Sequence, residues 1–271
     1  MNDYIDFNAR CRCAPEDTIP MDRVRTRLDE YVGRRDYAGA ARHLAYWLAE
    51  ARALGDTRGE FAVLNERMGV CRKMGDGPGA LQSAEEALAL LPVLENEDSI
   101  AAGTAYVNAG TVSDCFGDPE TAIARFEAAR RIYEASLAPE DERLGGLYNN
   151  MALALTDLGR YGEAEDCYRR ALAVMERQRS GQLERAITWL NLADLAAASL
   201  GPDAAEERIA EHLRTAEALL TDPTVPRNGY YAFVCEKCAP TFSYYGWFGT
   251  ASDLQAAADR IYRENGEGAA R

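Results

Sequence analysis

The residues in this sequence best suited to chemistry are two close cysteine pairs, Cys11 with Cys13 and Cys235 with Cys238. Four thiolates are a common ligand set of a structural zinc ion. Cys235 and Cys238 are three residues apart on a predicted helix, so both side chains can face one side of it. They also stand where the sequence elsewhere has small apolar residues, and unligated cysteine packs as a small hydrophobic side chain. We therefore predict packed, unligated thiols rather than a zinc site, and no metal or other cofactor.

Residues of the common catalytic motifs do not occur together in the sequence. The two histidines, His43 and His212, are far apart and are predicted to be packing or surface residues of helices. The metalloprotease, nucleophile-elbow, P-loop and dinucleotide-binding motifs are missing. The glycine-rich stretch 75–79 (GDGPG) lacks the Lys-Ser/Thr pair of a phosphate-binding loop, so we interpret it as a turn. We predict that the protein is not an enzyme; a catalytic site of an unrecognised kind is the alternative.

The charge balance limits the partners of the protein. The 271 residues include 30 Lys and Arg and 44 Asp and Glu, a net charge of −14. Such a field repels phosphate backbones and anionic lipid surfaces, so we expect no nucleic acid and no membrane among the partners. A neutral or basic protein segment is the expected partner. The N-terminus has no apolar signal segment, and the seven cysteines are typical of reduced thiols, so we expect a cytoplasmic protein.

Glycines recur at a constant interval along the chain. Gly75, Gly117, Gly159 and Gly201 are each separated by 42 residues, and Gly246 follows 45 residues later. After three of these glycines, small or aromatic residues stand five, nine and twelve positions on, and a small residue often stands seven positions before. The residues concerned are Ala80, Ala84 and Ala87; Ala122, Phe126 and Ala129; Ala164, Tyr168 and Ala171; and, before the glycine, Gly110, Ala152 and Ala239. Spacings of three and four place residues on one helix face, and a glycine ends a helix easily. The pattern predicts repeated helix pairs joined by tight glycine turns, which must stack to bury their apolar faces.

These residues resemble the tetratricopeptide repeat family. The stretch from Trp189 to Ala193 (WLNLA) fits the start of the family's first helix, and Ala122 with Phe126 and Ala164 with Tyr168 fit its second helix. The usual period of the family is 34 residues and that of HEAT repeats about 40–47, but the Ala/aromatic/Ala spacing favours tetratricopeptide repeats. The 42-residue form looks like the repeats of kinesin light chains and of many bacterial proteins.

The resemblance implies an all-α fold, an α–α superhelix (solenoid) of about six helix pairs. We expect an N-terminal arm at 1–20, the array at 21–264 and a C-terminal tail at 265–271. The repeats are expected near 21–54, 61–94, 103–137, 145–178, 186–220 and 230–264. The loop near 221–229, which contains Pro223 and Pro226, is the expected place for the stack to bend. Pro240 lies within the first helix of the last repeat, where a proline is expected to kink it.

For function, the resemblance implies a non-catalytic scaffold that binds a protein or peptide in a concave groove lined by the first helices. Residues carried over by position as groove residues are Asn65, Asn108, Asn149, Asn150, Asn191, Asp114, Asp157 and Lys237. An asparagine amide offers both a donor and an acceptor, so it can pair with a peptide bond of the ligand. The alternative is that these asparagines cap turns or link adjacent helices.

Two further alternatives concern the whole chain. It could be a regulatory sensor that binds a short signalling peptide or acts in trans on a regulator, as in bacterial regulators with similar arrays. It could also assemble with itself through its terminal repeats into a homo-oligomer. The aromatic residues between 230 and 248 are expected in the core of the last helix pair or, where exposed, at a partner or dimer surface.

Overall fold

A computed structural model describes residues 18–178 and 180–268, with the side chains described up to residue 264. Over these residues the chain forms twelve α-helices and no strand, which confirms the predicted all-α class. The helices are α1 (Met21–Gly33), α2 (Tyr37–Leu54), α3 (Thr57–Met74), α4 (Gly77–Leu90), α5 (Ile100–Cys115), α6 (Pro119–Ser136), α7 (Glu142–Asp157), α8 (Tyr161–Glu176), α9 (Gln182–Leu200), α10 (Glu206–Thr221), α11 (Gly229–Tyr244) and α12 (Phe248–Gly268).

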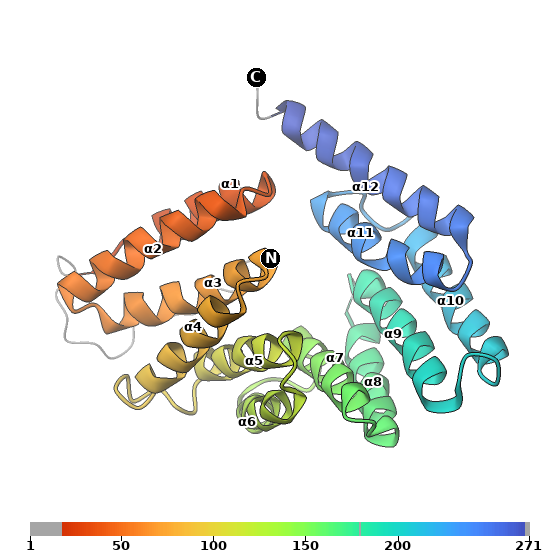
Figure 1. The fold of residues 1–271 in the computed structure, drawn as a ribbon, viewed down its shortest axis with the longest axis horizontal. Helices are drawn as coiled ribbons and strands as arrows, with labels where there is room; N and C mark the ends of the chain where they lie inside the picture. The colour runs from red at the N-terminus through yellow and green to blue at the C-terminus, as the bar shows by residue number, and fades with distance from the viewer. Residues whose placement is uncertain (1–17, 179, 269–271) are drawn as a thin grey trace. The chain divides into compact units, whose positions relative to one another are not determined.

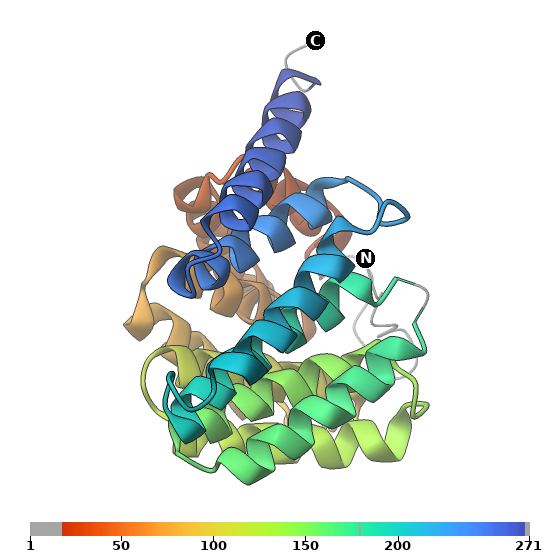
Figure 2. The ribbon, with the colours of Figure 1, turned by 90° about the vertical axis from the view of Figure 1, so that its right-hand side faces the viewer.

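The helices pack in consecutive pairs, and within each of the two compact units of the chain each pair packs against the next (Figure 1). The chain divides into two compact units, an N-terminal unit up to Leu137 and a C-terminal unit from Ala138. The N-terminal unit holds the pairs α1–α2, α3–α4 and α5–α6, and the C-terminal unit holds α7–α8, α9–α10 and α11–α12. In Figure 2 the helices of the C-terminal unit can be followed from green to blue. α8, α9 and α10 each pack against the helix before them, and α11 packs against α9 and α12. Each unit is therefore a stack of three helix pairs.

The periodic glycines all lie in the turn between the two helices of a pair. Gly75, Gly117, Gly159, Gly201 and Gly246 have φ between 71° and 87°, a region that side chains with a Cβ rarely adopt. In the turn of Gly117, the amide of Asp118 donates to the carbonyl of Ser113 at 2.9 Å, which closes the end of α5. The glycine spacing thus marks the turns of five of the six helix pairs.

Aspartates start four helices of the N-terminal unit. The side chains of Asp36, Asp56, Asp76 and Asp118 each accept a hydrogen bond from the amide three residues later, at the first turn of α2, α3, α4 and α6. Such a cap satisfies an amide that has no partner within its own helix. The Gly-Asp pairs of the sequence therefore end one helix and begin the next.

The small and aromatic residues of the period form the core of each stack. All nine of the residues predicted at the positions after Gly75, Gly117 and Gly159 are buried, with exposed fractions of 0–1%. Gly110 and Ala152, at the positions before the turn, are buried as well. The predicted core positions are confirmed, because small side chains at the helix crossings let the aromatic residues of the partner helix fill the remaining space.

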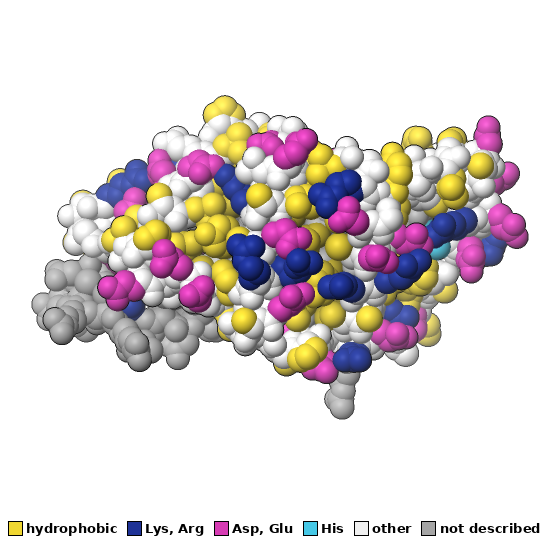
Figure 3. All heavy atoms as spheres, turned by 90° about the horizontal axis from the view of Figure 1, so that it is seen from below, with side chains coloured by type: hydrophobic (Ala, Val, Ile, Leu, Met, Phe, Trp, Pro, Cys, Tyr) yellow, Lys and Arg dark blue, Asp and Glu magenta, His cyan; other side chains and the backbone are white. Residues whose placement is uncertain are grey.

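Ion pairs connect the second helices of successive pairs. Arg52 of α2 bonds to Glu86 of α4, Glu85 of α4 to Arg125 of α6, and Glu165 of α8 to Arg208 of α10. The face shown in Figure 3 carries acidic and basic side chains in alternation rather than a field of one sign. Exposed pairs of this kind contribute little stability each, about 0–1 kcal/mol. Each of these pairs neutralises an acidic side chain of one second helix with an arginine of a neighbouring second helix in the same unit.

The loop between α10 and α11, where a bend was expected, is firmly packed. Val225 is buried, and Arg227 donates to the carbonyl of Leu220 at 2.8 Å and to that of Thr221 at 3.3 Å. The Arg227 guanidinium also lies 4.1 Å from the centre of the Tyr231 ring. These contacts hold the loop to both flanking helices. A bend of the stack at this loop stays a prediction.

Candidate functional site

The first helices of each unit form one surface, which we call its first-helix face: α1, α3 and α5 in the N-terminal unit, α7, α9 and α11 in the C-terminal unit. Adjacent first helices pack against each other, α3 with α5, α7 with α9 and α9 with α11. The groove residues predicted from the sequence all lie on these helices. The site is therefore built here from the contacts that these helices make.

In the N-terminal unit, α3 and α5 bring Asn65 and Asn108 together. The Asn108 side-chain amide donates to Oδ1 of Asn65 at 3.4 Å, and the Asn65 amide donates to the carbonyl of Phe61 at 3.0 Å. Both side chains line a hollow of about 90 Å³. The other lining residues are Arg25, Phe61, Ala62, Glu66, Ala101 and Thr104.

The rim of this hollow is charged but balanced. Nε of Arg25 lies 3.2 Å from Oε1 of Glu66, and both side chains are about one third exposed. Oδ1 of Asn108 makes no hydrogen bond with the described residues. A peptide N–H would therefore find an acceptor here, next to an ion pair that can reorient in solvent.

In the C-terminal unit, Asn149 links two helices. Its amide donates to Oγ1 of the fully buried Thr188 at 2.8 Å, which ties α7 to α9. Oδ1 of Asn149 is itself buried and has no hydrogen-bond partner in the part of the protein that is described. The interpretation that some of these asparagines link helices therefore fits Asn149, and in part Asn65 with Asn108.

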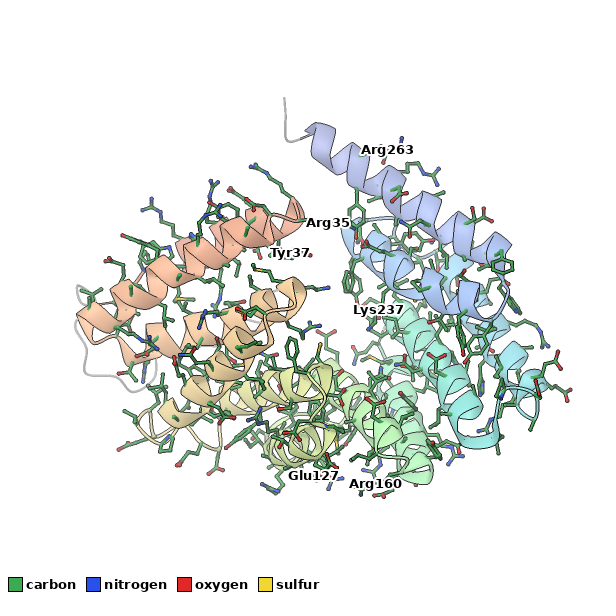
Figure 4. All side chains as sticks on the ribbon, in the orientation of Figure 1. Arg35, Tyr37, Glu127, Arg160, Lys237 and Arg263 are labelled. Atoms are coloured by element: carbon green, nitrogen blue, oxygen red, sulfur yellow. The ribbon has the colours of Figure 1, made fainter. Side chains whose placement is uncertain are left out.

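Three other predicted groove residues recur at one position of successive first helices, two residues before a small buried residue of the same helix. Asn150, Asn191 and Lys237 precede Ala152, Ala193 and Ala239 in this way. Asn150 and Asn191 are half-buried, and Lys237 is exposed on the side of α11 away from α12 (Figure 4). The Asn191 amide makes no hydrogen bond with any described residue, so its donors and acceptor are available. Of the remaining two, Asp114 is half-buried on α5 and Asp157 is exposed at the end of α7.

A larger hollow, which the sequence analysis missed, lies between α9 and α11. It has a volume of about 630 Å³. Its lining consists of Asp194, Ala197, Ala198, Pro202, Pro240, Thr241, Tyr244 and Tyr245. The Tyr245 hydroxyl donates to Oδ1 of Asp194 at 2.9 Å, and burial raises the pKa of the Asp194 carboxyl although part of the residue is exposed. In the sequence, Pro202 and Pro240 together with the adjacent Tyr244 and Tyr245 could have indicated this hollow.

The aromatic residues of the last helix pair divide between core and surface. Tyr231 and Phe242 are buried, whereas Tyr244 is 80% and Phe248 68% exposed. Tyr230 is 47% exposed and donates to Oε1 of Glu184 at 2.8 Å. Burial of the hydroxyl, together with the charge of Glu184, raises the pKa of Tyr230. The prediction of core residues is confirmed for Tyr231 and Phe242, whereas a partner or dimer surface at the exposed rings stays a prediction. α11 continues as a helix through Pro240.

The residues considered for metal or catalytic chemistry are packed. Cys235 and Cys238 are buried, and burial raises the pKa of the Cys238 thiol to about 12. Cys11 and Cys13 lie outside the described residues. His43 contacts the carbonyl of Val24 through Nε2 at 3.0 Å. Within 18–178 and 180–268, no group of three or more His, Cys, Asp and Glu side chains is placed to hold a metal ion.

His212 is an unusual member of the core. Its ring is 8% exposed and lies 5.2 Å from the ring of Trp189, centre to centre. Neither ring nitrogen has a hydrogen-bond partner in the described part of the chain. Burial, followed by the charge of Arg208, lowers the pKa of His212, so the neutral ring is favoured.

None of the described helices combines the length and the apolar character that a span through a bilayer requires.

Stacked helix pairs with glycine turns and small residues at the crossings define an α-helical repeat protein. Residues 143–218 match the family model described as "Tetratricopeptide repeat". This stretch therefore resembles tetratricopeptide repeats, the family that the sequence predicted. Repeats of this fold generally form non-catalytic scaffolds that mediate protein–protein interactions.

Solved structures share the fold. A putative kinesin light chain with nearly identical TPR-like repeats from Podosopora anserina is 15% identical, with a TM-score of 0.53 over 77% of this chain and 97% of that one. BtubC (BKLC) from P. vanneervenii is 21% identical, with a TM-score of 0.50 over 92% of this chain and 93% of that one. A comparison with curated proteins finds no match. At these identities the likeness concerns the fold alone.

Proposed function

We propose that the protein is a non-catalytic scaffold that binds an extended segment of another protein on its first-helix faces. The observation that carries this proposal is the recurrence of polar side chains at one position of successive first helices, with Asn191 free of any hydrogen bond to described residues. Asparagine is unfavourable at an interior helix position unless its side-chain amide forms hydrogen bonds to groups outside the helix.

The surroundings of these residues support binding rather than catalysis. The hollow at Asn65 and Asn108 presents an unused carbonyl oxygen beside apolar side chains, which suits the backbone and a small side chain of an extended ligand. Hydrogen bonds to a backbone tolerate many ligand sequences, and the side chains around them supply selectivity. The acidic net charge of −14 favours a neutral or basic segment.

The proposal is tested with peptides selected from a displayed library of linear sequences on the intact chain. A selected peptide is synthesised with a fluorophore, and its affinity is measured by fluorescence anisotropy. Asn191→Ala and Asn108→Ala should each weaken binding about fivefold, because each removes one hydrogen bond to the ligand. Their melting temperatures should stay close to that of the parent chain.

The control is Asn96→Ala, in the loop between α4 and α5, where the side chain has no hydrogen bond to described residues. It should leave the affinity unchanged. Failure to select any peptide, or equal affinities of all three variants and the parent, would overturn the proposal.

The sensor alternative uses the same face and differs in its ligand. A sensor for signalling peptides should bind a short peptide with free termini more tightly than the same residues inside a longer protein. A scaffold should bind both equally, so capping the termini of the selected peptide separates the two.

A further inference from the structure

The hollow between α9 and α11 of the C-terminal unit has no part in the peptide contacts proposed above. Its lining is mostly apolar. Pro202 and Pro240 contribute rigid rings, and Ala197 and Ala198 contribute small side chains that leave space for a ligand. The rings of Tyr244 and Tyr245 meet edge to face at 4.9 Å. A volume of about 630 Å³ is large enough to accept a long side chain with its neighbours.

A single carboxylate supplies the charge of this lining. Asp194 accepts one hydrogen bond, from the Tyr245 hydroxyl at 2.9 Å, and pairs with no cation among the residues described. Other acidic residues of the protein have arginine partners, as in the pairs Glu85 with Arg125 and Glu165 with Arg208. Asp194 is solvent-exposed beside an apolar lining and has no such partner, so its carboxylate is available to an incoming cation.

The rings beside this carboxylate favour one kind of cation. Tyr244 is 80% exposed, so the face of its ring is open to a ligand. A guanidinium is planar, is weakly hydrated and stacks on aromatic rings while it donates to a carboxylate. An ammonium group is compact and strongly hydrated, and it would gain less from the proline and tyrosine surfaces.

We propose that this hollow binds an arginine side chain of the partner segment, with the guanidinium donating to Asp194 and stacking on Tyr244. The inference rests on the proposed function, because it names the residue that the bound segment must carry. The apolar walls formed by Pro202 and Pro240 then contact the aliphatic stem of the arginine and the residues beside it. The hydrogen bond from the Tyr245 hydroxyl occupies Oδ1 of Asp194 and leaves Oδ2 for the guanidinium.

The experiment uses the displayed peptide library on the intact chain and reads the residues that selection enriches. Arginine should be enriched at one position of the selected peptides. A selected peptide is then synthesised in three forms, with arginine, with lysine and with citrulline, which has the shape of arginine without its charge. Against the parent chain, the citrulline form should bind about tenfold more weakly and the lysine form should fall between the two.

Two variants of the protein complete a double-mutant cycle. Asp194→Asn keeps the shape and the acceptor for Tyr245, and it should weaken the arginine form about tenfold while leaving the citrulline form unchanged. Tyr244→Ala removes an exposed ring, which folding does not need, and it should weaken the arginine form severalfold. The matched control Asp253→Asn makes the same change of charge at an exposed position of α12. It should bind all three peptides as the parent does.

The outcomes separate the two proposals. One contrary result is that the selected peptides need Asn191 or Asn108 and yet show no preference for arginine; another is that arginine and Asp194 show no coupling. Either result overturns this inference and leaves the scaffold function intact. Absence of any selected peptide overturns both. If Asp194→Asn melts at the same temperature as the parent, its loss of binding is a local effect. If Asp194→Asn is less stable than the parent, the affinity of Tyr244→Ala tests the proposal instead.

Discussion

Gly110 and Phe126 are packed so closely that a Cβ atom on Gly110 would stand 2.5 Å from Cε1 of the phenyl ring. The contact joins the two helices of the α5–α6 pair at their crossing. Phe126 is fully buried and has no room to move aside. Gly110→Ala should therefore lower the free energy of unfolding by about 1–3 kcal/mol, the usual cost of overpacking. Urea denaturation followed by circular dichroism measures it.

Gly69 in α3 is the matched control for this substitution. Nothing lies within 4 Å of a Cβ atom placed on it. Gly69→Ala should raise the free energy of unfolding by about 0.5–1 kcal/mol, because alanine restricts the unfolded chain more than glycine. If both variants shift in the same direction, the close contact of Gly110 with Phe126 does not set the helix crossing.

Asp56 and Asp76 cap successive helices, but Asp56 has a second function. Its Oδ1 accepts from the amide of Gly59 at 2.9 Å, and its Oδ2 accepts from the amide of Ile19 at 2.9 Å. Asp56→Ala would leave the amide of Ile19 buried and unpaired in addition to losing the cap. We expect a loss of about 2–3 kcal/mol in the free energy of unfolding, measured by chemical denaturation.

Asp76 isolates the effect of the cap. It is exposed and caps α4 through the amide of Gly79 at 3.0 Å. Asp76→Ala should cost about 1 kcal/mol. Equal losses in the two alanine variants would mean that the bond from Ile19 contributes nothing.

His212 should make the stability of the protein depend on pH. Burial lowers its pKa in the folded state below the ordinary value of 6.5. Between that lowered pKa and 6.5 the unfolded chain binds the proton more readily than the folded chain, so the free energy of unfolding falls as the pH is lowered through this window. Melting temperatures should therefore decrease from pH 7 toward pH 5.

Two histidine variants test the assignment. His212→Phe keeps a ring beside Trp189 and removes the titrating group, so the decrease between pH 7 and pH 5 should become smaller. His43→Gln leaves His212 in place and should retain the full decrease. A pH profile of His212→Phe identical to that of the parent would assign the dependence to other groups.

Much of the fold could be predicted from the sequence because its signals are local. Gly75, Gly117 and Gly159 mark turns that need a positive φ, and residues such as Ala122 and Phe126 follow at helical spacing. The first pair was less regular in sequence, and the structure shows why. Arg35, with φ of 57°, occupies the left-handed position that glycine has in the other pairs. A search for glycine cannot find such a turn.

The candidate site was less predictable because it depends on contacts between helices. Sequence spacing placed Asn149 and Asn191 on first helices, but it could not show that Asn149 bonds to Thr188 while Asn191 bonds to no described residue. The hollow at Asp194 was missed for the same reason. It is formed by side chains of α9 and α11 that are about 45 residues apart in sequence.

The order of packing has a consequence for biosynthesis. Each helix makes its main contacts with helices that directly precede or follow it in the chain. Contacts of such short range close small loops and form quickly. A nascent chain can therefore complete one helix pair soon after it leaves the ribosome, and each finished pair offers a surface on which the next one forms.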